Sequence, residues 1–171
     1  MADADLFQNE RVELIRGIIV RMSPQKEAHA TVIQILTRIF VPALLGRADV
    51  RVQLPFAASD DSMPEPDLAL VAVTRFGQPH PGHAFLVIEV AEASLRDDRE
   101  EKAELYAAVG VPEYWIVNIP DRAIEVHTEA VRSVYTRVTP YRIGQTVAPA
   151  AFPDVKVVLA ELFAVDAGPA V

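Results

Sequence analysis

Apolar residues recur along this chain with the two periods that distinguish strands from helices. Residues 11–15 and 18–22 flank Arg16-Gly17, a two-residue link typical of a hairpin, and residues 48–56 alternate as a strand does. A helical repeat predicts one helix over 26–45, which Pro42 should kink or end, and a second over 95–109, which Gly110 terminates. Short apolar runs at 68–73 and 85–91 predict two buried strands.

The remaining third of the chain continues the strand pattern. We predict strands over 114–118, 123–127, 131–138 and 155–159, followed by a closing turn at 161–163. With the two principal helices, these strands indicate a mixed sheet in a single domain of the α/β (α+β) class with an N-terminal hairpin. The domain is expected to span residues 10–163, between an N-terminal tail (1–9) and a C-terminal tail (164–171).

The composition narrows the classes of protein to which this chain can belong. Its 171 residues are 51% hydrophobic and 23% charged, as in a folded protein with one core. No run approaches the roughly 18 apolar residues of a membrane-spanning helix, and the acidic start is unlike a signal peptide, so we expect a cytoplasmic protein with no membrane contact. The absence of cysteine excludes disulfides, thiolate chemistry and cysteine-based zinc sites. A net charge of −8 argues against a broad basic surface for phosphate backbones.

One carboxylate, Glu89, interrupts the apolar run 85–91. An ionised group in a buried strand costs several kcal/mol unless a partner or a cation compensates it. Asp67 follows Pro66 at the start of the other apolar run, where an aspartate commonly bonds to its own backbone and has no further function. If both acids lie at corresponding positions of neighbouring strands, they form an oxygen-rich site for a hard cation such as Mg²⁺.

The second predicted helix adds a cationic group to this candidate site. One stripe of its surface carries Leu95, Asp98, Lys102, Leu105, Tyr106 and Val109. Lys102 therefore lies on the apolar, inward-facing side of the helix. Two structural explanations stay open, a lysine that extends its ammonium to solvent and an ion pair with Asp98 one turn earlier. The functional alternative places the ammonium beside Asp67 and Glu89, where it would neutralise developing negative charge or orient an attacking water.

Several segments, in a fixed order, carry a resemblance to a known family. They are Pro66-Asp67, Glu89-Val90, residues 98–106 and residues 110–117, with further matches at 13–17, Met22-Ser23-Pro24, His29 and 152–155. Over residues 10–163 the chain resembles a large bacterial family of restriction endonucleases (Uma-type), which has the PD-(D/E)XK nuclease fold.

The resemblance implies a metal-dependent endonuclease that hydrolyses phosphodiester bonds, with DNA as the expected substrate. Asp67, Glu89 and the carbonyl of Val90 would hold Mg²⁺, with Mn²⁺ as the alternative ion, and the metal would activate a water. Lys102 would stabilise charge or position that water. His29 has two interpretations of equal weight, a residue that positions phosphate or transfers a proton, and a polar histidine near the start of a helix. A homodimer is expected if both strands of a duplex are cut.

Two departures from the family pattern leave other functions open. The usual superfamily lysine, two residues after the acid, is replaced by Ala91, so Lys102 has to supply the ammonium from the following helix. Glu92 adds an acid to the loop after Glu89 that could perturb or join the metal site. The alternatives are an inactive nuclease-fold module that binds or regulates, which the charge of −8 favours, and a metal-dependent hydrolase of another phosphate substrate. In the nuclease, a set of arginines would offset phosphate charge: Arg47, Arg51, Arg75, Arg96 and Arg99.

Overall fold

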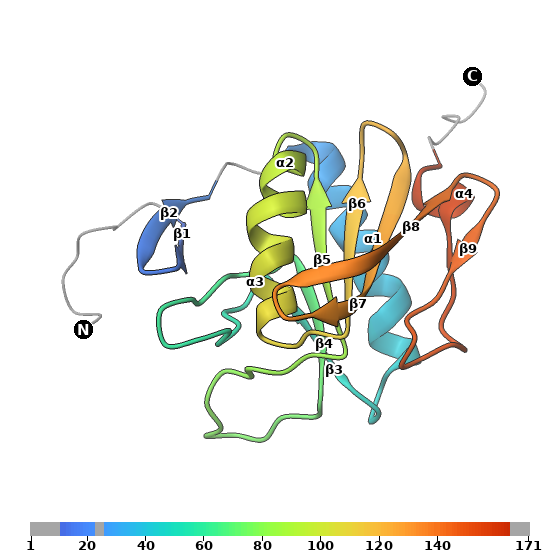
Figure 1. The fold of residues 1–171 in the computed structure, drawn as a ribbon. Coiled ribbons are helices and arrows are strands. Elements are labelled where there is room, and N and C mark those ends of the chain that lie inside the picture. Colours follow the sequence, from blue (N-terminus) through green and yellow to red (C-terminus); the bar gives the residue numbers. More distant parts are fainter. Residues whose placement is uncertain (1–10, 23–25, 165–171) are drawn as a thin grey trace.

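A six-stranded mixed sheet lies at the centre of the molecule, with the strand order β3-β4-β5-β6-β7-β8 (Figure 1). The computed structural model describes residues 11–22 and 26–164. The strands are β3 (Asp49–Val52), β4 (Leu68–Val71), β5 (Leu86–Ala91), β6 (Glu113–Asn118), β7 (Ala123–Val131) and β8 (Val134–Arg142). β5 and β6 run parallel, and the other neighbouring strands of this sheet run antiparallel. The mixed sheet predicted from the apolar pattern is therefore present.

The two predicted helices cover opposite faces of this sheet (Figure 1). One is α1 (Glu27–Ala43), and the other is a continuous helix made of α2 (Leu95–Asp97), a π-helical turn η1 (Asp98–Lys102) and α3 (Ala103–Ala108). Because successive side chains of a strand point to opposite faces, each central strand contributes to both cores. Leu68 and Ile88 pack with Phe40 on the α1 side, whereas Val87 packs with Tyr106 on the α3 side.

An N-terminal hairpin forms a separate two-stranded sheet from β1 (Val12–Ile15) and β2 (Ile18–Arg21). Its turn residues Arg16 and Gly17 both have positive φ, 49° and 76°, as the predicted two-residue turn requires. The hairpin binds the loop before β4 through main-chain hydrogen bonds, since the Met63 N–H donates to the Leu14 carbonyl at 2.7 Å. β9 (Thr146–Val147), β10 (Val157–Val158) and α4 (Leu159–Leu162) complete the described structure.

Several boundaries differ from the sequence prediction for local reasons. α1 ends at Ala43, directly after Pro42, because proline is tolerated only near a helix end or at a kink. The strand predicted over 131–138 is shifted to 134–142, since β7 continues to Val131 and the turn lies at 132–133. Pro140 lies inside β8, an edge strand, where a missing N–H costs little.

Three further outcomes concern the ends of elements and of the chain. The strand predicted over 48–56 ends at Val52, and the one predicted over 155–159 shrinks to the two residues of β10. The predicted tails, apart from residue 164, and the Ser23-Pro24 match lie outside the described residues.

Within the described ranges, no helix is both long enough and apolar enough for a membrane crossing.

Candidate active site

Asp67 and Glu89 lie side by side at one end of the sheet. β4 and β5 pair antiparallel with Leu68 opposite Ile88, and one step further along this register Asp67 lies opposite Glu89. Directly opposed residues of an antiparallel pair point to the same face, which here is the face that α3 covers. Both side chains are buried, with exposed fractions of 6% for Asp67 and 3% for Glu89. The structure therefore brings together the two acids that the sequence pattern singled out.

Asp67 is held by donors from three different segments. His29 Nε2 lies 3.0 Å from Oδ1, and Gln53 Nε2 donates to the same oxygen at 3.2 Å. The main-chain N–H of Val90 donates to Oδ2 at 2.9 Å. Burial disfavours the carboxylate, but His29 and these N–H donors outweigh it and hold the pKa of Asp67 below its usual range. Asp67 is therefore ionised and fixed in orientation, and His29 belongs to the site.

Glu89 presents one oxygen to two donors on the covering helix. Lys102 Nζ donates to Oε1 at 3.1 Å, and the Tyr106 hydroxyl donates to the same oxygen at 2.8 Å. Burial raises the pKa of Glu89 to about 8 despite the opposing charge of Lys102. Sequence reasoning had placed Tyr106 only in the apolar stripe, because the periodicity that locates a side chain does not reveal what its hydroxyl bonds.

Lys102 points inward and does not extend its ammonium to solvent. Its Nζ lies 3.1 Å from Glu89 Oε1 and 3.4 Å from Glu13 Oε1, and the side chain is 16% exposed. Burial opposes the ammonium, but the two carboxylates outweigh it and raise the pKa of Lys102. Asp98, the alternative partner, instead accepts a hydrogen bond of 2.6 Å from Ser94 Oγ. Of the predicted contacts, the structure contains the one between Lys102 and Glu89, and it adds Glu13 as a second carboxylate.

The donor set fits a hard divalent cation. Three carboxyl groups, Glu89, Glu13 and Asp98, act on the one buried lysine, Lys102. Burial raises the pKa of Glu89, and the neighbouring charges of Asp67, Asp98 and Glu13 add to this effect. Among the described residues, no group of three or more His, Asp and Glu side chains could by itself hold a metal ion. Two adjacent carboxylates with a main-chain carbonyl nearby suit Mg²⁺, which keeps several waters and uses one or two carboxylates together with substrate phosphate.

Neither residue at which the chain departs from the family pattern, Ala91 or Glu92, contributes a charged group to the pair of acids. Ala91 is fully buried in the cluster that contains Ala103 and Ala107 of the covering helix, so the usual lysine position is filled by packing. Glu92 does not join the two acids, because its carboxylate pairs with Lys26 at 3.2 Å.

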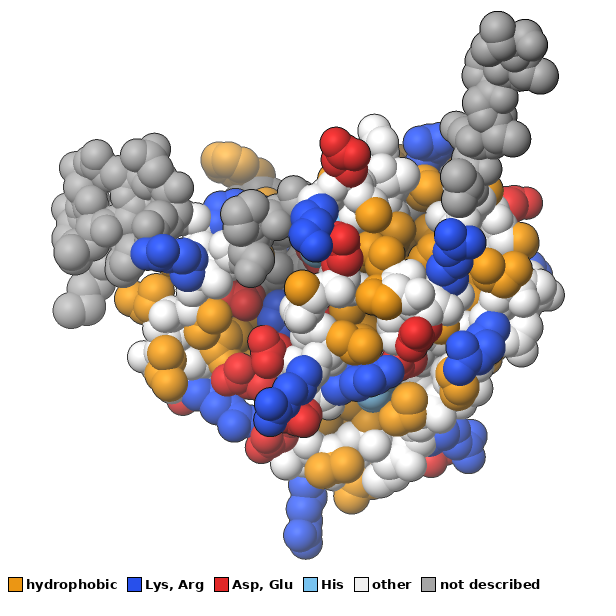
Figure 2. Space-filling model, turned by 90° about the horizontal axis from the view of Figure 1, so that it is seen from above, with side chains coloured by type: hydrophobic (Ala, Val, Ile, Leu, Met, Phe, Trp, Pro, Cys, Tyr) orange, Lys and Arg blue, Asp and Glu red, His pale blue; other side chains and the backbone are white. Residues whose placement is uncertain are grey.

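The five arginines expected to offset phosphate charge come from different parts of the chain, from the segment after α1 to η1. Three are already paired, Arg47 with Asp154, Arg96 with Glu100 and Arg99 with Glu125. Figure 2, which views the end of the molecule where α2 begins, shows acidic and basic side chains interspersed. This agrees with the expectation drawn from the net charge.

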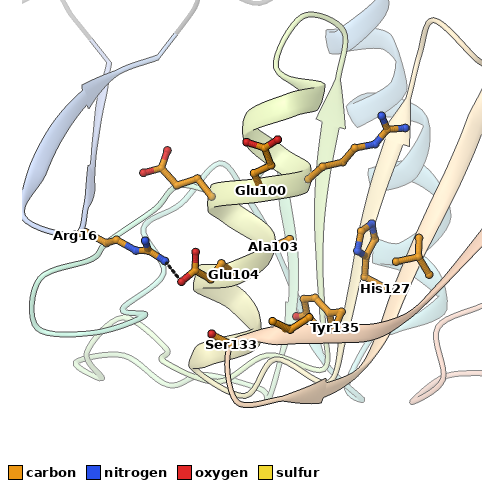
Figure 3. A pocket seen from close by; sticks show the side chains of 11 residues that line it. Arg16, Glu100, Ala103, Glu104, His127, Ser133 and Tyr135 are labelled. Atoms are coloured by element: carbon orange, nitrogen blue, oxygen red, sulfur yellow. Dashed lines mark ion pairs between the residues drawn. The ribbon is translucent and has the colours of Figure 1, made fainter.

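A hollow lies between the covering helix and the β7–β8 hairpin (Figure 3). This outer cavity has a volume of about 660 Å³, and its lining includes Glu100, Ala103, Glu104, His127 and Tyr135. An ion pair of 2.9 Å between Arg16 and Glu104 lies at its edge. Its lining combines Arg16 and Arg99 with Glu100, Glu101 and Glu104, so the cavity has no excess of positive charge for phosphate.

Comparison with known proteins places this architecture in a family. The sequence profile of the Uma2 family, described as "Putative restriction endonuclease", matches residues 3–161. The chain belongs to the Uma2 family. This membership confirms the resemblance inferred from the order of the segments. No curated protein sequence matches the chain.

The fold of this Uma2 protein is also found in a solved structure. A protein from Anabaena variabilis ATCC 29413, described as a "putative nuclease belonging to DUF820", superposes with a TM-score of 0.71. The two share 13% sequence identity, and the match covers 89% of each chain. At this identity the likeness concerns the fold, and it confirms the predicted nuclease-like architecture of the Uma2 chain.

Proposed function

We propose that this Uma2 protein is a Mg²⁺-dependent endonuclease that hydrolyses phosphodiester bonds in DNA. The observation that carries the proposal is the pair of buried carboxylates, Asp67 and Glu89, on adjacent strands with the ammonium of Lys102 at 3.1 Å from Glu89. Family membership supports a nuclease, and the excess of buried acid supports a divalent cation as the missing compensation.

Each residue of the site has a distinct part in this proposal. Asp67, Glu89 and the carbonyl of Val90 would hold Mg²⁺, or Mn²⁺ in its place. When bound, the ion supplies Lewis-acid polarisation of the phosphate and activates a water for attack. Lys102 stabilises negative charge on the phosphate or orients that water. His29 contacts Asp67 directly, which supports a role in orienting this carboxylate.

The net charge sets conditions on DNA binding. A chain of charge −8 has fewer cations than anions, and the face seen in Figure 2 mixes both, so few fixed cations are available for the phosphate backbone. Binding to DNA should therefore be weak, and its salt dependence should be shallow, because the slope scales with the number of phosphates that the protein neutralises. We also propose that a homodimer cuts the two strands of a duplex, because two-fold DNA matches two-fold protein. Sedimentation with and without a short duplex measures that assembly.

A plasmid-nicking assay tests the proposed activity. Purified protein is incubated with supercoiled DNA in Mg²⁺, in Mn²⁺ or in a chelator, and nicking is expected only with the metals. Asp67→Asn should abolish nicking and Lys102→Met should leave only a small residual rate, while circular dichroism stays that of a folded protein. Asp154→Asn is the matched control, since Asp154 is an exposed acid paired with Arg47 and lies outside the site.

Two outcomes would replace this proposal with an alternative. Metal binding measured by calorimetry, without cleavage of any DNA or RNA tested, would favour a non-catalytic module with a nuclease fold. Hydrolysis of a small phosphodiester such as bis(p-nitrophenyl) phosphate, without cleavage of polynucleotides, would favour a hydrolase of another phosphate substrate.

A further inference from the structure

The N-terminal hairpin contacts the covering helix through two ion pairs of different character. Glu13 Oε1 lies 3.4 Å from Lys102 Nζ, and these side chains are only 7% and 16% exposed. Arg16 pairs with Glu104 at 2.9 Å, and there both side chains are about half exposed, at 45% and 48%. An exposed pair contributes little to stability, whereas a buried charge needs its partner. The Glu13–Lys102 contact is therefore the one that the buried site depends on.

Glu13 occupies a position where a strand of this kind would ordinarily carry an apolar residue. In β1 the buried positions are Glu13 and Ile15, two residues apart and on the same face. The other carboxylate oxygen of Glu13, Oε2, accepts a hydrogen bond of 3.3 Å from the Glu65 main-chain N–H, which fixes the group. Among the described residues, Lys102 is the cation that pairs with Glu13. Docking of the hairpin alone would be served better by a leucine or valine, because burying an ionised group is costly.

Lys102 contacts two carboxylates, and only one of them is a proposed metal ligand. Its contact with Glu89 involves a carboxylate that, on the proposed function, also serves a divalent cation. A cation there would share the charge of Glu89 and repel the ammonium. Glu13 belongs to a different sheet and is not one of the proposed metal ligands, so its contact with the ammonium remains when a cation shares the charge of Glu89.

We infer that Glu13 is a positioning residue that holds the ammonium of Lys102 in the active site, so that β1 contributes one residue to the support of that site. The inference deepens the proposed function and rests on it for its catalytic meaning. It extends the site to the N-terminal hairpin, far in sequence from Asp67, Glu89 and Lys102.

Kinetics of matched variants test the catalytic part of this inference. Glu13→Gln keeps the size of the side chain and an acceptor for the Glu65 N–H but removes the charge, and Glu13→Asp retains the charge. We expect kcat to fall by about 100-fold in Glu13→Gln with KM little changed, because a displaced catalytic group costs about this much. Glu13→Asp should recover part of the loss. Arg16→Gln, which breaks the exposed ion pair of the same hairpin, should change kcat by less than about threefold.

A double variant separates positioning from general support of the fold. If Glu13 acts through Lys102, then adding Glu13→Gln to Lys102→Met should lower the residual rate by less than about twofold, since the partner is already absent. A further loss equal to that of Glu13→Gln alone would overturn the inference. Equal rates for Glu13→Gln and the wild type would also overturn it.

A nuclear magnetic resonance measurement gives a readout that does not depend on cleavage. The chain has three lysines, Lys26, Lys102 and Lys156, so the ¹⁵N ammonium signal of Lys102 is identified by its loss in Lys102→Met. Proton exchange of this ammonium should be at least about tenfold faster in Glu13→Gln and unchanged in Arg16→Gln. Unchanged exchange in Glu13→Gln would refute the positioning role. Suppose that the wild type cuts no DNA, but that ammonium exchange is faster in Glu13→Gln than in the wild type. This result would refute the proposed function and still establish that Glu13 holds Lys102.

Discussion

Replacing Glu89 by Gln isolates the free-energy cost of a buried carboxylate. The amide keeps an oxygen for the donors Lys102 and Tyr106, so packing and hydrogen bonding change little. What disappears is a group whose pKa is raised by burial from 4.5 to about 8. The variant should therefore differ from the wild type mainly in how its stability depends on pH.

The sign of this pH dependence follows from the proton affinity of Glu89 in the folded and the unfolded protein. The folded protein binds the Glu89 proton more tightly than the unfolded chain, so its contribution to stability is complete below pH 4.5 and is lost as pH rises towards 8. Over that window the difference between the two pKa values corresponds to about 5 kcal/mol, or about 1.4 kcal/mol per pH unit. Lys102 adds no slope here, because its raised pKa affects stability only above its ordinary value of 10.5.

Urea denaturation followed by the fluorescence of Trp115, the one tryptophan of the chain, measures this difference. Both proteins are unfolded in a chelator at pH 5, 6, 7, 8 and 9. The free energy of unfolding of Glu89→Gln should exceed that of the wild type by an amount that grows with pH and levels off above pH 8. Mg²⁺ should raise the stability of the wild type more at pH 8.5 than at pH 5.5. If the free energies of unfolding of the two proteins change with pH in parallel, the reasoning is refuted. That result would mean that folding does not raise the pKa of Glu89.

Three further changes test other parts of the structure. Tyr106→Phe removes a donor to the buried Glu89 carboxylate and should lower the free energy of unfolding by about 1.5–3 kcal/mol in urea titrations at pH 9, where Glu89 is ionised; no loss would mean that this hydrogen bond is not formed. Phe40→Ala should leave a cavity between α1 and the sheet and cost about 3–5 kcal/mol by calorimetry, and a much smaller loss would show that α1 packs loosely. Burial opposes ionisation of Glu125, but Arg99 and other donors lower its pKa, so this carboxylate stabilises the fold above its ordinary value of 4.5. Arg99→Ala should therefore depress the melting temperature at pH 7 more than at pH 3, and equal depression at both would contradict the assignment of that ion pair.

The parts of the site that could be predicted are those set by periodicity within one element. Glu89 stands out because its neighbours in β5 are apolar, and Lys102 is placed inward by the spacing of apolar residues along its helix. The pairing of β4 with β5, which brings Asp67 opposite Glu89, is not contained in either segment alone. It became an expectation only through the resemblance to a known family.

The parts that could not be predicted depend on contacts between distant segments. Gln53 was expected inside a strand, but β3 ends before it and its φ is 51°, an unusual value for a residue with a side chain. Its main-chain N–H bonds the carbonyls of Pro66 and Asp67 instead of a neighbouring strand. Glu13 lies in a segment that resembled the family, yet nothing local indicates that the hairpin folds back onto Lys102.

The π-helical turn η1 changes the directions in which nearby side chains point around the helix axis. In an α-helix, residues four apart drift by about 40° around the axis, so Asp98 and Tyr106 would diverge by about 80°. A π turn advances less per residue and drifts back by about 30° over four residues, which nearly cancels the drift of the α-helical turn that follows. Asp98 and Tyr106 therefore lie at nearly the same angle around the axis, with Lys102 between them. Deleting one residue from η1 would leave a good helix but rotate the part that carries Lys102 and Tyr106 relative to α2, so that the ammonium and the hydroxyl would together turn away from Glu89.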